Sequence, residues 1–212
     1  MTLNKSIAAL IFLVLVGGFL IYKVYFVSSV MSAANRNTEN NAASYKVLKS
    51  QNIMVGKDID QGYYDIKALD SEAEFFGDKM HKNAVLHARP FYLNAKMSIR
   101  GKIEFKPSEF EKAGKKNQKI IMKDPGDYVV GTEIPAGNYV LSRTTDKIRV
   151  FVDIKDETET ESLQTIQWEI DEKVKKPIEI ELKKGYNVYI DKTGKDGYIS
   201  NDGDLILERN NE

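Results

Sequence analysis

Histidine is the residue type best suited to acid–base and metal chemistry, and the chain contains two, His81 and His87. They stand six residues apart in HKNAVLH, which suits neither one helix face nor adjacent positions on one face of a strand. Asp78 lies one helical turn before His81, but a zinc site needs three or four converging ligands. No third ligand is evident, so the pattern predicts exposed polar histidines and no metal site.

Nucleophilic catalysis has little support in the sequence. There is no cysteine, which excludes disulfides, thiolate metal sites and a cysteine nucleophile. A Gly-x-Ser-x-Gly elbow around a nucleophilic serine is also absent. We therefore predict no catalytic, cofactor-binding or metal-binding residue. A hydrolase that uses an unrecognised carboxylate pair is the third-ranked class of function.

Two acidic turns near the C-terminus invite a calcium interpretation. An EF-hand loop needs oxygen ligands at alternate positions, and Lys195 occupies one of them, so that loop is excluded. An irregular Ca²⁺ site built from Asp196, Asp202 and Asp204 stays open. Ordinary β-turns are favoured, because Asp-Gly and Asn-Asp-Gly form turns without any ligand.

Charged runs and the single tryptophan have simple structural interpretations. Residues 153–161 are acidic and unpatterned, which predicts a solvated loop. Basic patches at 112–116 and 173–176 suit anionic wall polymer or lipid headgroups, but adjacent glutamates favour a solvated surface. Trp168 stands in an alternating segment, which indicates a core residue rather than a sugar-stacking platform.

The composition limits the class of protein. The 212 residues include 31 basic and 31 acidic side chains, and this balance argues against a nucleic-acid partner, which requires a basic surplus. Hydrophobic residues make up 42%, enough for the core of one large domain or two small ones.

Residues 7–27, IAALIFLVLVGGFLIYKVYFV, are the strongest signal in the sequence. They are long enough to span the bilayer core of about 30 Å as a helix. Lys23 and the neighbouring aromatic residues stand at the end that would meet the headgroups. We predict an uncleaved anchor; the alternative is a signal peptide cleaved near Ser32-Ala33-Ala34, but the apolar run is long for one. The cysteine-free, strand-rich body and the short N-terminal tail favour an extracytoplasmic C-terminal body.

The rest of the chain divides into a spacer and two related halves. Residues 32–45 are small and polar, which predicts a flexible linker after the anchor at 1–31. Residues 55–66 and 130–141 share the pattern V-G-x-[DE]-I-x-x-G-x-Y-x-[IL], which predicts two modules at 46–116 and 117–212.

The shared pattern indicates a strand, a tight turn and a second strand. The first glycine ends a strand, the isoleucine fills the core beneath the turn, and Gly62 or Gly137 supplies a positive φ. A weaker correspondence pairs residues 93–99 with 182–188.

Period-2 alternation of apolar residues predicts a mainly β fold, made of two tandem antiparallel β-sandwich or half-barrel modules. The clearest rows contain Ile148, Val150, Val152, Ile154, Ile166, Trp168, Ile170, Ile178, Ile180, Leu182, Tyr186, Val188, Ile190, Leu205 and Leu207. Capping boxes predict short helices at 72–80 and 109–113, the latter stopped by Gly114.

The segment YVVGTEIPAGNYVL at residues 128–141 resembles the VGxDIPAGxYxL motif of small β-rich extracytoplasmic domains in Gram-positive lipoproteins and membrane-anchored proteins. The first copy departs from it, with Asp60-Gln61 in place of Pro135-Ala136. The resemblance implies a β fold and a cell-envelope location, and it brings no catalytic residue.

These observations predict a non-enzymatic, single-span membrane protein that presents tandem β modules outside the cytoplasmic membrane. Its expected partners are the lipid bilayer and another envelope or membrane protein, with no small-molecule substrate evident. The alternative is an accessory subunit of a membrane complex for secretion, transfer or division, in which the transmembrane helix itself contributes to assembly.

Overall fold

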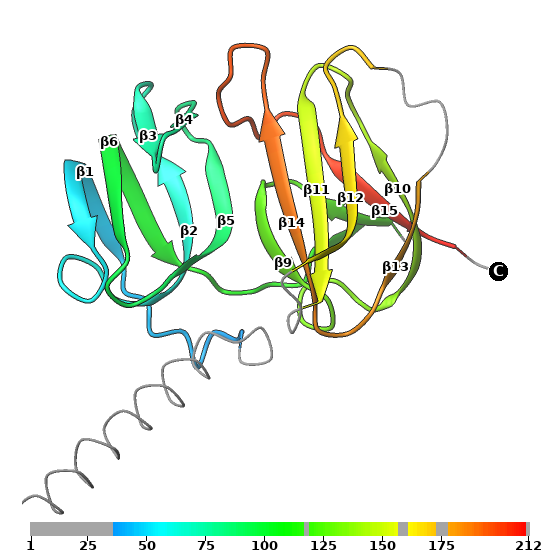
Figure 1. Cartoon of the computed structure of the whole chain (residues 1–212), viewed down its shortest axis with the longest axis horizontal. Helices are drawn as coiled ribbons and strands as arrows, with labels where there is room; N and C mark the ends of the chain where they lie inside the picture. Colours follow the sequence, from blue (N-terminus) through cyan, green and yellow to red (C-terminus); the bar gives the residue numbers. More distant parts are fainter. Residues whose placement is uncertain (1–35, 117–118, 157–160, 173–177, 211–212) are drawn as a thin grey trace, which may run out of the picture.

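The computed structural model describes residues 36–116, 119–156, 161–172 and 178–210. In these ranges the chain forms β-strands and no helix (Figure 1). The N-terminal half contributes β1 Lys46–Met54, β2 Gly62–Ala68, β3 Ala73–Phe75, β4 Asp78–Met80, β5 Val85–Phe91 and β6 Lys96–Pro107. The C-terminal half contributes β7 Gly114–Lys116, β8 Lys119–Met122, β9 Gly126–Val129, β10 Gly137–Arg143, β11 Arg149–Asp156, β12 Ser162–Trp168, β13 Ile178–Leu182, β14 Tyr186–Thr193 and β15 Leu205–Arg209.

The strands form two sheets. A curled ten-stranded sheet has the order β12-β11-β14-β9-β5-β2-β6-β3-β4, with β1 paired to β6. A five-stranded antiparallel sheet has the order β13-β10-β15-β8-β7 and faces the C-terminal part of the large sheet (Figure 1). The large sheet crosses from one half to the other at a parallel bridge between His87 on β5 and Gly126 on β9, and an isolated parallel bridge also joins Met80 to Ile199.

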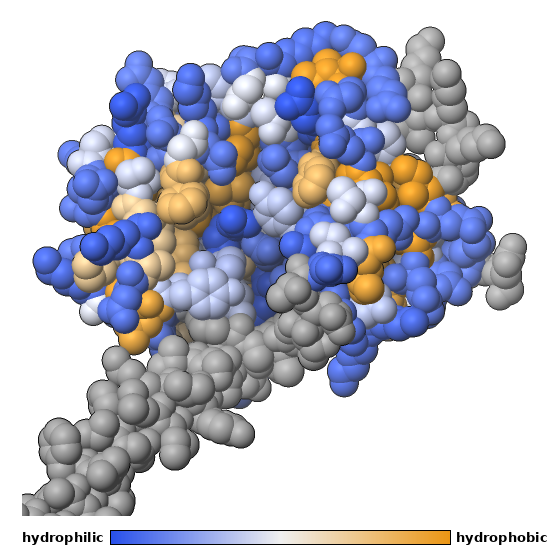
Figure 2. Space-filling model, in the orientation of Figure 1, coloured by the Kyte–Doolittle hydropathy of each residue, from blue (hydrophilic) through white to orange (hydrophobic). Residues whose placement is uncertain are grey.

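Alternation of apolar side chains places a separate core in each half. The C-terminal core contains Val150, Val152 and Ile154 of β11 and, as predicted, Trp168 of β12, which is 3% exposed. The N-terminal core contains Tyr64, Phe91 and Phe105, together with one residue from the other half, Ile199. On the face drawn in Figure 2, a band of apolar residues lies over β2, between β6 and β5. The mainly β prediction is confirmed.

The predicted helix at 72–80 is wrong, because this segment is the β3–β4 hairpin. A capping box is a local signal, whereas Ala73, Phe75 and Met80 are all buried in the N-terminal core and β3 also pairs with β6. Phe76 and Gly77 take φ values of 53° and 96° at the hairpin tip, which a helix cannot contain.

The predicted helix at 109–113 is also wrong, and Gly114 begins β7 instead of stopping a helix. Because β7 pairs with β8, the predicted module boundary at 116/117 falls inside a hairpin of the five-stranded sheet. The acidic run predicted as a loop is β11 as far as Asp156, and Asp153 is buried there. Residues 157–160 lie outside the described ranges.

The two copies of the repeat fold alike. Gly56 and Gly131 have φ values of 88° and 99°, and each N–H donates to the isoleucine carbonyl three residues later at 2.6 Å. The tyrosine hydroxyls close the second turn in the same way: Tyr64 donates to the Asp60 carbonyl at 3.0 Å and Tyr139 to that of Pro135 at 2.7 Å. The tight turn therefore uses the first glycine of the motif for its left-handed residue.

Gly62 and Gly137 begin β2 and β10 and also have positive φ values, 143° and 157°. The weaker correspondence holds with a different register. The Asn94 N–H donates to the first-copy Val55 carbonyl, as Gly185 does to the second-copy Val130 carbonyl. These contacts align residue 94 with 185, whereas the predicted correspondence of 93 with 182 would align it with 183. The observed register is therefore shifted by two residues, which keeps the same strand face.

The predicted flexible spacer does not describe residues 36–44, named here the strap. The Asn41 amide donates to the Tyr63 and Ser108 carbonyls, and the Asn41 side-chain oxygen accepts the Tyr63 N–H at 3.0 Å. Arg36 is 3% exposed. Within the described ranges, no helix has the length and hydrophobicity to cross a membrane. The predicted span at 7–27 and the basic patch at 173–176 lie outside these ranges.

Candidate functional site

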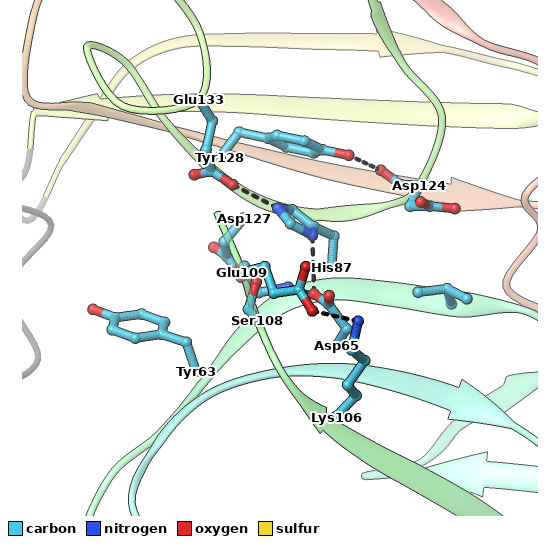
Figure 3. A network of polar contacts seen from close by, with 12 residues as sticks. Tyr63, Asp65, His87, Lys106, Ser108, Glu109, Asp124, Asp127, Tyr128 and Glu133 are labelled. Carbon is cyan, nitrogen blue, oxygen red and sulfur yellow. Dashed lines mark hydrogen bonds and ion pairs between the residues drawn. The ribbon is translucent and has the colours of Figure 1, made fainter. Parts of the chain in front are cut away.

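Charged side chains from both halves meet where the large sheet crosses from β5 to β9 (Figure 3). His87 of β5 lies between two carboxylates: its Nδ1 is 3.0 Å from Asp65 Oδ1, and its Nε2 is 2.6 Å from Glu133 Oε1. The His87 side chain is 15% exposed and that of Glu133 is fully buried. The prediction of an exposed His87 is therefore wrong, because the ring is the link between the halves.

The two carboxylates keep His87 protonated. Burial would lower its pKa, but the hydrogen bonds to Asp65 and Glu133 outweigh burial and raise the pKa to about 9. Burial likewise tends to raise the pKa of Asp65, and the contact with His87 holds it below its usual value. At neutral pH both ring nitrogens therefore donate to carboxylates, and His87 forms an ion-pair clamp between the two halves.

Glu133 reaches the clamp from the acidic position of the repeat. Its Oε2 accepts the Val129 N–H at 2.8 Å, and in the first copy Asp58 Oδ2 accepts the Met54 N–H at the same distance. The acidic residue of the motif thus closes its own turn in both copies. In the second copy its other oxygen pairs with His87.

Arg36 adds a second buried cation from the strap. Its Nη2 donates to the Asp127 carbonyl at 2.6 Å and to the Ala88 carbonyl at 3.4 Å, and it lies 3.7 Å from Glu133 Oε2. The guanidinium carbon also lies over the rings of Tyr63 and Phe110, 4.7 and 5.2 Å from their centroids. Arg36 therefore contacts both halves and the connector between them.

Further contacts complete the junction. Arg89 pairs with Asp127 at 2.9 Å, although burial still raises the pKa of this carboxyl. The Tyr128 ring packs on His87, with centroids 4.6 Å apart, and burial raises the pKa of its hydroxyl. Beside the clamp lies a cleft of about 440 Å³, lined by Asp65, His87, Tyr128 and the β6–β7 connector.

The second histidine matches its prediction more closely. His81 is 53% exposed at the side chain and pairs with Asp196 at 2.8 Å, and its ring stacks on Tyr198. Asp78 lies on β4; among the described residues, no group of three His, Asp or Glu could hold a metal ion.

The three aspartates considered for calcium do not converge. Asp196 forms an ion pair with His81, whereas Asp202 and Asp204 lie near the ammonium group of Lys192. Lys192 is 1% exposed and donates to the Lys123 and Gly203 carbonyls. Burial lowers its pKa to about 8 in spite of the nearby carboxylates. A protein ammonium group therefore supplies the positive charge in this acidic region.

Sequence reasoning missed the clamp because its members are far apart in the chain. Glu133 and His87 are 46 residues apart. One usable signal existed: the repeat requires an acidic residue at its fourth position, and such a requirement indicates a buried hydrogen-bonding role. Comparison of the chain with protein families, with curated proteins and with solved structures found no match.

Proposed function

We propose that the protein is a non-enzymatic, single-span membrane protein whose two related β modules bind or scaffold another component of the cell envelope. The observation that carries this proposal is the duplicated turn, which keeps the same glycine, acid and tyrosine contacts in both halves. Duplicated modules raise avidity without new chemistry. The ion pairs of His87 with Asp65 and Glu133 agree with this role, because they join the two modules.

The apolar segment at 7–27 and the motif at 128–141 support an envelope location, with the body outside the cytoplasmic membrane. Protease added to intact protoplasts should then degrade the body and leave a small anchored fragment. Full protection of the body would refute this orientation. Crosslinking in native membranes, followed by mass spectrometry, should recover one or a few envelope proteins in stoichiometric amounts.

A second candidate is an accessory subunit of a membrane complex. The docked strap favours it, because only residues 28–35 separate the proposed span from Arg36, which is buried in the junction. Replacement of residues 7–27 by an unrelated anchor distinguishes the two candidates. A surface binder keeps its crosslinked partner after this exchange, whereas a subunit that assembles through its helix loses it.

A further inference from the structure

The junction contains a buried pocket whose chemistry suits a guanidinium group. Its walls are the carboxylate of Glu133, the carbonyls of Asp127 and Ala88, and the rings of Tyr63 and Phe110. A buried carboxylate and carbonyl acceptors between two aromatic faces recognise the planar, delocalised charge of arginine better than the compact ammonium of lysine. Arg36 fills this pocket and is 3% exposed.

The occupant belongs to a segment that is separate from both cores. Of the strap, Ala43 packs as a partly buried residue against the N-terminal core, and Arg36 stacks on the small cluster that contains Tyr63 and Phe110. Elsewhere the strap is held by polar contacts, such as the exposed bond from Thr38 Oγ1 to the Glu109 carbonyl at 2.7 Å. Segments with few buried apolar contacts open at low free energy.

The fit of Arg36 is incomplete. Its Nε is buried and has no hydrogen-bond partner among the residues that the structure describes. A buried donor without a partner lowers the stability of the docked state. An arginine that approaches from another direction can therefore compete with it.

We propose that this pocket is a receptor site for an arginine side chain of a partner polypeptide, and that Arg36 occupies it in cis until the strap is displaced. The partner inserts its guanidinium group between Tyr63 and Phe110 and pairs with Glu133. Because the strap competes, the apparent affinity for the partner equals the intrinsic affinity multiplied by the fraction of molecules in which the pocket is empty. The pocket rests on the junction contacts alone and does not depend on the envelope location.

The test is a chemical rescue in the full chain, solubilised in detergent. Arg36→Ala empties the pocket. Arg100→Ala is the matched control, because the Arg100 side chain is 74% exposed and its ion pair with Glu74 is long, at 3.8 Å. Binding of N-acetyl-arginine methylamide is measured by calorimetry and by the shift in thermal midpoint, with the lysine analogue as the charge-matched probe. Arg36→Ala should bind the arginine probe at least about tenfold more tightly than the wild type or Arg100→Ala, as expected when a competing internal ligand is removed.

Equal binding by all three proteins, equal binding of the two probes, or no binding by a folded Arg36→Ala variant would overturn the proposal. Asn41→Ala keeps Arg36 and removes the side-chain bonds that hold the strap to Tyr63 and Ser108, so it serves if Arg36→Ala does not fold. It should bind the arginine probe more tightly than the wild type, and no increase would refute the displaceable strap. A peptide of residues 35–44, added to Arg36→Ala, tests whether the arginine comes from another copy of this chain. If this peptide binds and the arginine probe does not, the site joins copies of this chain, and the assignment to another polypeptide is wrong.

Discussion

Replacement of His87 by glutamine tests whether the junction depends on a charged imidazole. At about 1.36 kcal/mol per pH unit, a pKa raised from 6.5 to about 9 corresponds to about 3 kcal/mol of stability. Because the folded pKa exceeds the unfolded one, this stability is fully present below pH 6.5. It is lost as the pH rises from 6.5 through 9, where the folded protein releases the proton.

His87→Gln removes the cation closest to Glu133 and leaves this buried carboxylate with the Val129 N–H and with Arg36, at 3.7 Å. Breaking one side of a buried ion pair typically costs about 3–5 kcal/mol. The variant should therefore be at least about 3 kcal/mol less stable than the wild type at pH 6. It should also lack the loss of stability between pH 6.5 and 9.

Denaturant unfolding, followed by Trp168 fluorescence and circular dichroism at pH 6, 7.5 and 9, measures both effects. His81→Gln is the matched control, because His81 is half exposed and its ion pair with Asp196 is a surface pair. Such pairs contribute at most about 1 kcal/mol. The clamp is refuted if His87→Gln keeps the wild-type pH dependence, or if His81→Gln loses it.

Three further outcomes follow from single contacts, each measured by denaturant unfolding. Gly62→Ala should be about 1 kcal/mol more destabilising than Gly137→Ala, because a Cβ at Gly62 meets a strap backbone nitrogen at 2.6 Å, whereas a Cβ at Gly137 meets a flexible arginine side chain at 3.3 Å. Opening of the strap relieves the clash at Gly62, so its docking free energy limits the difference. Equal losses would mean that the strap is not docked. Tyr64→Phe and Tyr139→Phe should each cost about 1 kcal/mol, with Tyr64 the larger, since its hydroxyl also accepts a strap N–H; a loss in only one copy would contradict the equivalence of the turns. Folded Lys192 has a pKa of about 8, so between pH 8 and 10.5 the unfolded chain binds a proton that the folded protein has released, and the stability of the wild type should rise with pH. Lys192→Met should abolish this rise. A rise that persists in the variant would assign it to another group.

The elements that the sequence predicts well are those whose signal is local and periodic. The apolar rows of β11 and β14 alternate because each strand has one face toward a core, and they are buried as predicted. The repeat could be recognised because a tight turn restricts residue types at fixed offsets. Local signals failed where tertiary pairing competed, as at residues 72–80, where burial of Phe75 and Met80 overrides the capping box.

The junction could not be predicted from local patterns. His87 and Asp65 are brought together by pairing of β2 with β5, and Glu133 arrives from another motif copy. The small polar residues around Arg36 indicate a spacer, because residues of this kind cannot form a core of their own. They dock because the β modules offer carbonyl acceptors and aromatic faces at the place where the strap passes.

Differences between the two copies of the repeat explain how a duplicated turn produces one asymmetric junction. Both acidic residues close their own turn, but the glutamate at 133 carries one methylene more than Asp58 and has an oxygen free to bind His87. Gly62 admits the strap backbone at a distance that a Cβ atom does not allow, whereas Gly137 faces the side chains of Arg209 and Tyr139. Each copy thus keeps the contacts that form the turn, and in the second copy the acidic position also binds the other half. Binding specificity, where it resides at this junction, is therefore expected at the divergent positions rather than at the shared ones.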